Sequence, residues 1–284
     1  MKPFEYFAPR TLHEALDILV RYGGDARPIA GGTDLLLKMK LGEAAPRAVV
    51  NIKHIPELRR RYAFPNRLTL GALTTVEEIR RSCIVRDNAP ALAMAAATMA
   101  STQIRNLATL GGNLCTAAPS ADLAPVLMAL SATVHIAGPG GERCIPLDEF
   151  FLGPGQTALA PNELVISADL PRFMGPALYL KHMPRESMDI AVAGVGIALS
   201  LSDGRCESAR IVLGAVAPKP MRALQAEAEL TAGPFTPERI ARTAHIAAQE
   251  SQPIDDVRGA SWYRRHMIEV MTRRGLSDLR LGAG

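Results

Sequence analysis

Closely spaced cysteines and long apolar runs are both missing from this chain of 284 residues. The four cysteines, Cys83, Cys115, Cys144 and Cys206, form no CxxC pair and have no other close metal-binding spacing. We therefore expect free, buried thiols in a reducing cytoplasm, and neither an iron-sulfur nor a zinc site in this chain. No apolar run is long enough to span a bilayer, and no apolar signal sequence follows Met1. These absences predict a cytoplasmic protein without an integral membrane segment.

A strong excess of charge of one sign is missing as well. The 32 basic residues are nearly matched by 28 acidic ones, so we expect no nucleic-acid partner. Basic residues gather only in residues 258–280, where a predicted helix carries Arg264-Arg265-His266 and Arg273-Arg274. This stretch predicts a solvated helix face or a surface that docks a partner protein.

Two glycine doublets lie in matching settings, Ala30-Gly31-Gly32-Thr33-Asp34-Leu35 and Thr109-Leu110-Gly111-Gly112-Asn113. A glycine has no Cβ, so its backbone amide can approach an anion closely. Neither loop contains Lys or Arg, and we therefore expect amide dipoles and a helix N-terminus to compensate the anion's charge. The two loops together predict a clamp for the pyrophosphate of one dinucleotide.

The first loop follows a predicted strand, helix and strand. Thr11 and Glu14 have the spacing of a capping box, Gly23 is a helix stop, and the strand at residues 26–30 leads into the loop. This order is typical of a nucleotide-binding β-α-β unit, but the G-x-G-x-x-G fingerprint is absent. Its absence argues against the commonest NAD-binding fold.

The remaining pattern predicts further elements and one domain boundary. Ser120 is the expected N-cap of a helix, with Asp122 in its first turn. Strands are expected at residues 48–52, 67–72, 132–137, 163–169, 177–183, 191–201 and 210–216, and helices after Leu35 and Thr75 and at residues 90–100, 121–130, 223–231, 236–250 and 261–274. A composition change at residues 171–176 predicts a domain of residues 1–175, with subdomains 1–55 and 56–175, and a C-terminal domain of residues 176–284.

With both loops in this order, the chain resembles the flavin-binding medium subunit of molybdenum hydroxylases, the family of xanthine dehydrogenase and aerobic carbon monoxide dehydrogenase. The resemblance covers essentially the whole chain, and further motifs that carry it are Gln103-Ile104-Arg105-Asn106, Pro119-Ser120-Ala121-Asp122, Asp189-Ile190-Ala191 and Tyr263-Arg264-Arg265. It implies an α+β protein with the two-subdomain FAD-binding fold of the vanillyl-alcohol oxidase type. A C-terminal three-stranded sheet with a helix cluster would follow.

The resemblance implies that FAD is bound by both loops. Backbone amides of residues 30–34 and 109–113 would hold the pyrophosphate, and Asp122 would accept a hydrogen bond from ribose or adenine. From the residue alone, Asp122 is equally a helix-start carboxylate, and Cys115 is expected to have a packing role. The implied cofactor-binding set is Ile29, Ala30, Gly31, Gly32, Thr33, Asp34, Leu35, Thr109, Gly111, Gly112, Asn113, Asp122, Val165 and Lys181, with no catalytic residue and no metal ligand.

The chemistry expected of the chain is electron transfer. None of the six histidines lies in either loop, and no serine-histidine or paired-carboxylate arrangement for hydrolysis is legible. The resemblance implies a flavoprotein oxidoreductase subunit that takes electrons from a partner [2Fe-2S] subunit and passes them to NAD, a quinone or oxygen. A large molybdopterin subunit would complete the assembly, as a dimer of heterotrimers.

Two other functions stay open at this point. A self-standing flavin oxidoreductase of the same fold would turn over its own substrate as an isolated chain. A non-catalytic nucleotide-binding or assembly module would purify without yellow colour. The sequence identifies neither the substrate of the complex nor its electron acceptor.

Overall fold

The N-terminal part is a parallel three-stranded sheet with strand order β1-β3-β2. The computed structural model describes residues 1–282. The elements are β1 (Glu5–Phe7), α1 (Leu12–Tyr22), β2 (Ala26–Ile29), α2 (Leu35–Leu41) and β3 (Ala48–Asn51). Thr11 caps α1 as predicted, but the Glu14 carboxylate accepts from the Arg10 amide, so the reciprocal bond of a capping box to Thr11 is not made.

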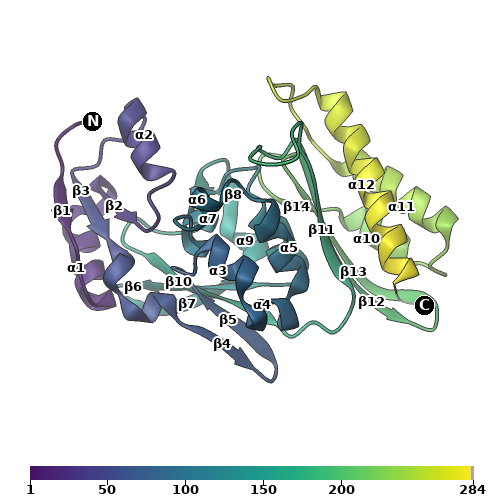
Figure 1. Ribbon diagram of the computed structural model, residues 1–284, viewed down its shortest axis with the longest axis horizontal. Coiled ribbons are helices and arrows are strands. Elements are labelled where there is room, and N and C mark those ends of the chain that lie inside the picture. Colours follow the sequence, from purple (N-terminus) through teal and green to yellow (C-terminus); the bar gives the residue numbers. More distant parts are fainter. Residues whose placement is uncertain (283–284) are drawn as a thin grey trace.

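The middle part is an antiparallel five-stranded sheet with helices gathered on one side (Figure 1). Its strand order is β4-β5-β10-β6-β7, with β4 (Arg61–Phe64), β5 (Arg67–Gly71), β6 (Thr133–Gly138), β7 (Gly141–Pro146) and β10 (Leu164–Pro171). The helices are α3 (Val76–Arg81), α4 (Cys83–Asn88), α5 (Pro90–Thr98), α6 (Thr102–Arg105), α7 (Leu110–Thr116), α8 (Leu123–Ala129) and α9 (Leu147–Phe150), and a small hairpin is formed by β8 (Phe151–Gly153) and β9 (Gln156–Thr157). The largest apolar core lies between this sheet and its helices.

The C-terminal part is an antiparallel sheet of order β11-β12-β13-β14 covered by three helices. The strands are β11 (Ala177–His182), β12 (Ala193–Ser202), β13 (Arg205–Gly214) and β14 (Met221–Arg222), and the helices are α10 (Leu224–Thr231), α11 (Pro237–Glu250) and α12 (Ser261–Leu281). The two-residue β14 is a fourth strand beside the three predicted. α12 continues seven residues beyond the predicted end at Arg274.

Two local predictions from the sequence were wrong. Ser120 does not cap a helix, because α8 begins only at Leu123 and no side chain caps it. β13 begins at Arg205 rather than near Arg210, because Asp203 and Gly204 form a two-residue hairpin turn. Both turn residues have positive φ, +49° and +72°, as a type I′ turn requires. An Asp-Gly pair between apolar runs is a hairpin signal that could have been read.

The strand β12 is buried on both faces, and its side chains alternate between two neighbours. Gly196 faces α8, so closely that an added Cβ would lie 2.7 Å from the Pro125 carbonyl oxygen. Ile197 faces α12, where its Cδ1 fills the space beside Gly275. The C-terminal sheet is therefore packed between its own helices and the middle part, although the predicted boundary at residues 171–176 stays a prediction. Within residues 1–282, no helix is long and apolar enough to cross a membrane.

We predict that Gly196→Ala lowers the free energy of unfolding by about 1–3 kcal/mol, because the methyl group overpacks the contact with Pro125. Urea unfolding monitored by circular dichroism measures the change. Gly140→Ala is the matched control, since its added Cβ would meet no atom within 4 Å. Equal stability of the two variants would contradict the close packing of β12 on α8.

Candidate cofactor-binding site

A cleft of about 700 Å³ brings the two glycine loops together. The first loop leads from β2 into α2, and the second leads into α7. The cleft is wide enough for a cofactor-sized ligand. Of the predicted residues, those that line it are Ile29, Ala30, Gly31, Gly32, Thr33, Asp34, Leu35, Thr109, Gly111, Gly112, Asn113 and Val165.

The first loop presents a run of backbone amides to the cleft. From Ala30 to Leu35, no amide donates to an acceptor within the described part of the chain, and the first to do so is Leu36, to Gly32 O at 3.1 Å. Six successive donors without a protein partner make a site for an anion's oxygens. This arrangement fits the pyrophosphate role predicted for residues 30–34.

The second loop uses its amides differently. Leu110 donates to Thr74 O at 2.9 Å and Gly111 to Ala72 O at 2.8 Å. The Gly112 amide donates to Thr109 Oγ1 at 3.1 Å, and that of Asn113 to the Thr109 carbonyl at 2.9 Å. These four amides are therefore not the free donors that the sequence predicted, because two of them bond to Thr74 and Ala72 outside the loop and two bond to Thr109, the N-cap of α7. The loop can still offer the Thr109 amide and the side chain of Asn113.

The Asn113 side chain is the clearest polar group without a partner in the cleft. Its Oδ1 is buried without a hydrogen bond among residues 1–282, and its Nδ2 lies 4.0 Å from Met99 Sδ. Buried polar atoms rarely lack a partner, so this amide fits a cofactor that would complete its bonding. Thr109 Oγ1, in contrast, is already occupied as the cap of α7.

The glycines of the two doublets have a packing role that the sequence did not reveal. A Cβ on Gly31 would lie 2.0 Å from Leu107 O, and one on Gly111 would lie 2.8 Å from Ala72 Cβ. Gly31 therefore allows the first loop to touch the chain that leads into the second. Gly32 has φ +75°, which side chains rarely adopt.

Two cationic side chains at the cleft were not predicted from the sequence, because they lie outside the two loops. Arg27 on β2 and Lys38 on α2 both line it. The Arg27 guanidinium donates to Gly24 O and Ala26 O, both at 2.7 Å, and Lys38 is exposed. Helical spacing places Lys38 one turn beyond Asp34, which is the signal that could have found it.

Asp122 and Lys181 do not line the cleft. Their side chains form a buried ion pair, Oδ2 to Nζ at 2.9 Å, and Lys181 also donates to Thr98 O at 3.1 Å. Tyr179 donates its hydroxyl to Asp122 Oδ1 at 2.9 Å. Burial raises the pKa of Asp122 against the opposing effect of Lys181, and burial beside Asp122 also raises the pKa of Tyr179. The network ties β11 to the end of α5, and a contact of either residue with a cofactor stays a prediction.

Cys115 lines the cleft and is an exposed residue, as are Cys83 and Cys144, so the expectation of four buried cysteines was wrong for all but Cys206. Protein atoms surround the Cys115 thiol on its other sides, and this desolvation raises its pKa to about 12. The thiol is protonated at neutral pH and is a weak nucleophile.

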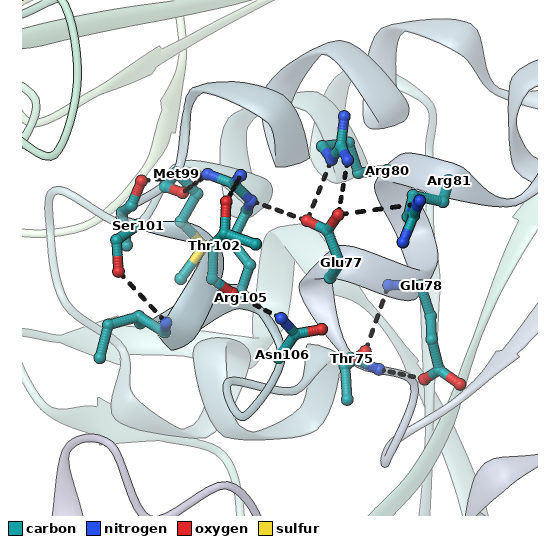
Figure 2. A network of polar contacts seen from close by, with 12 residues as sticks. Thr75, Glu77, Glu78, Arg80, Arg81, Met99, Ser101, Thr102, Arg105 and Asn106 are labelled. Carbon is teal, nitrogen blue, oxygen red and sulfur yellow. Dashed lines mark hydrogen bonds and ion pairs between the residues drawn. The ribbon is translucent and has the colours of Figure 1, made fainter.

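A buried carboxylate, Glu77, is contacted by arginines of α3 and by Arg105 of α6, which precedes the second loop in the chain (Figure 2). Arg105 donates its Nε to Glu77 Oε2 at 2.9 Å, and Arg80 donates its Nε to the same oxygen at 3.0 Å. Hydrogen bonds from these two arginines lower the pKa of Glu77 to about 2. Glu77 lies in α3, which begins with a complete capping box between Thr75 and Glu78.

The parallel lobe, the antiparallel sheet and the two-loop cleft together define a dinucleotide-binding α+β protein. The family model for the FAD binding domain in molybdopterin dehydrogenase matches residues 2–173, and that for the CO dehydrogenase flavoprotein C-terminal domain matches residues 178–279. The chain belongs to this family of FAD-binding oxidoreductase subunits. The predicted family, fold class and cofactor are thereby confirmed.

Relatives with known names match over nearly their whole length. The carbon monoxide dehydrogenase medium chain of Hydrogenophaga pseudoflava is 34% identical over 96% of each chain, and the xanthine dehydrogenase FAD-binding subunit of Escherichia coli O157:H7 is 31% identical over 98% of this chain and 97% of its own. A solved structure of the H. pseudoflava carbon monoxide dehydrogenase, lacking the Mo-pyranopterin moiety, covers 98% of both chains with a TM-score of 0.94 and 36% identity. Quinoline 2-oxidoreductase from Pseudomonas putida 86 matches with a TM-score of 0.94 and 29% identity, over 100% of this chain and 99% of its own.

We predict that Glu77→Gln removes a pH-dependent part of the stability. Because the folded-state pKa is depressed from 4.5 to about 2, the ionised Glu77 contributes stability above pH 4.5 that is lost as the pH falls toward 2. Urea unfolding between pH 7 and pH 2.5 should show a lower stability of the variant at neutral pH and a shallower decline in acid. Glu186→Gln, which changes an exposed carboxylate, is the control. Parallel declines of wild type and Glu77→Gln would contradict the prediction.

Proposed function

We propose that this chain is the FAD-carrying electron-transfer subunit of a heteromeric molybdenum hydroxylase. It receives electrons from a partner [2Fe-2S] subunit and passes them to NAD, a quinone or oxygen. Bound FAD supplies the exchange between one-electron and two-electron transfer. The observation that carries the proposal is the set of six unpaired amides at residues 30–35, which share one cleft with the orphaned Asn113 side chain.

The residues of the cleft divide the work of binding. The amides of residues 30–35 hold the pyrophosphate oxygens, and the unpaired Asn113 Oδ1 accepts a hydrogen bond from a donor group of the cofactor. Arg27 and Lys38 supply positive charge at the same cleft. Ile29 and Val165 are buried and form an apolar wall that excludes water from this part of the cleft.

The cleft holds no apparatus for acid-base chemistry of its own. Among the described residues that line it there is no histidine, and its carboxylates are Asp34 and Glu163. Arg143 contacts both oxygens of Glu163 at 2.8 Å and lowers the pKa of that carboxyl, so Glu163 stays ionised and a weak base. These features favour electron transfer through a bound cofactor, and they disfavour the oxidation of a separate substrate in this cleft.

The names of two relatives support the proposal that this chain works in a complex of several subunits. Carbon monoxide and glyceraldehyde dehydrogenase relatives are each named medium chains, the latter from Sulfolobus acidocaldarius. We infer a large subunit with the molybdopterin cofactor and a small [2Fe-2S] subunit, assembled in the cytoplasm as a dimer of heterotrimers. The exposed basic residues of α12, Arg265, Arg273 and Arg274, are available on its outer face.

We predict that Asn113→Asp weakens FAD binding at least about tenfold, because an isosteric carboxylate would face the phosphates in the same cleft. The chain is co-expressed with its neighbouring subunits, and flavin, iron and molybdenum are measured in the purified complex. Asn66→Asp, in an exposed turn, is the matched control.

In the same experiment the iron-sulfur clusters are reduced with dithionite, and NAD, a soluble quinone and oxygen are offered in turn. The wild-type complex should reduce an acceptor, and the Asn113→Asp complex should keep its metals but reduce that acceptor slowly. A wild-type complex without FAD would refute the proposal. Undiminished acceptor reduction by a flavin-free Asn113→Asp complex would refute the electron-exit role.

A further inference from the structure

Residues 99–108 form a segment that touches both halves of the proposed FAD clamp. At its start, Met99 lines the cleft beside Asn113. Near its end, Leu107 O fills the space beside Gly31 of the first loop. The Ala108 carbonyl accepts from the Val76 amide at 2.9 Å and so joins the segment to α3. The shape of this segment therefore sets how the two loops face each other.

One side chain, Arg105, holds the segment in this shape (Figure 2). Its Nη1 donates to Met99 O at 2.9 Å and to Ala100 O at 3.1 Å, and its Nη2 donates to Thr102 Oγ1 at 2.9 Å. Ala100 has φ +43°, a conformation that alanine rarely adopts. Arg105 thus closes a turn that the backbone alone would disfavour.

Arg105 is itself fixed by Glu77. The two side chains are 12% and 6% exposed, and the ion pair spans from α3 to α6. Arg80 contacts Glu77 from α3 itself and makes no hydrogen bond to residues 99–108. Arg81, also in α3, lies 3.9 Å from Glu77 Oε1, so three arginines surround this carboxylate, and of the three only Arg105 bonds to residues 99–108.

We propose that Arg105 is a positioning residue for FAD: anchored by Glu77, it fixes residues 99–108 so that both loops meet the cofactor at the required spacing. This inference rests on the proposed function of the cleft. Arg105 does not line the cleft and acts through Met99 and Leu107. A lysine cannot replace it, because an ammonium lacks the planar fork that bonds a carboxylate and three further oxygens together.

The test compares Arg105→Met and Arg105→Lys with Arg80→Met in the full chain, co-expressed with its partner subunits. FAD content, the rate of flavin release and the visible circular dichroism of the bound flavin are measured beside the thermal midpoint of each complex. Both Arg105 variants should bind FAD at least about tenfold more weakly, with an altered flavin spectrum. Arg80→Met should change FAD affinity less than about twofold, whatever its loss of thermal stability.

Thr102→Val removes a single hydrogen bond to Arg105 and serves if Arg105→Met does not fold. It should release flavin faster than wild type at an unchanged thermal midpoint. FAD affinity and flavin spectrum like those of wild type in Arg105→Lys or Thr102→Val would overturn the positioning role. Equal losses of FAD in Arg80→Met and Arg105→Met would also overturn it, since both would then act through stability alone. A wild-type complex without FAD would instead overturn the proposed function on which the role rests.

Discussion

The approach of Gly31 to the Leu107 carbonyl is the contact on which the rest of the cleft depends. No side chain fits between them, since a Cβ on Gly31 would lie 2.0 Å from that oxygen. The contact joins the parallel N-terminal lobe to the chain that leads into the second loop, two regions that are distant in sequence. Because the lobes meet here, the free amide donors of residues 30–35 and the unpaired acceptor Asn113 Oδ1 open into the same cleft. The donors and this acceptor would otherwise lie on separate surfaces.

The two loops differ in how many of their backbone amides are free to bind a ligand, and this difference suits the binding of a cofactor. The second loop is rigid, because its amides bond to Ala72, Thr74 and Thr109. The first loop supplies the donors that have no partner in the protein. A rigid frame beside preorganised amide dipoles binds an anion without needing many cations, and the cofactor then carries the redox chemistry. The protein's remaining task is to fix the distance between the loops, which is where Arg105 and Glu77 enter.

The sequence predicted the elements with strong local signals, including the loops, the N-cap of α1 at Thr11, the helix after Thr75 and the helices of the C-terminal part. The pairing of Asp122 with Lys181 was not predictable, because it joins the start of α8 to β11 across the core. Nor could the bonds of the Leu110 and Gly111 amides be predicted, since their acceptors Thr74 and Ala72 lie far from them in sequence. The sequence predicted that Gly31 lets the backbone approach an anion, but it did not predict that Gly31 packs against Leu107 O. Leu107 carries no sequence signal that would indicate this contact.

The central claim, that the amides of the first loop grip the pyrophosphate, is tested most directly by hydrogen exchange measured with and without FAD. Amides 30–35 should exchange freely in the chain without FAD and become protected when it binds. Amides 110–113 should already be protected and change little, because they donate within the protein. Unchanged exchange at residues 30–35 on binding FAD, or new protection confined to residues 110–113, would contradict the role of the first loop.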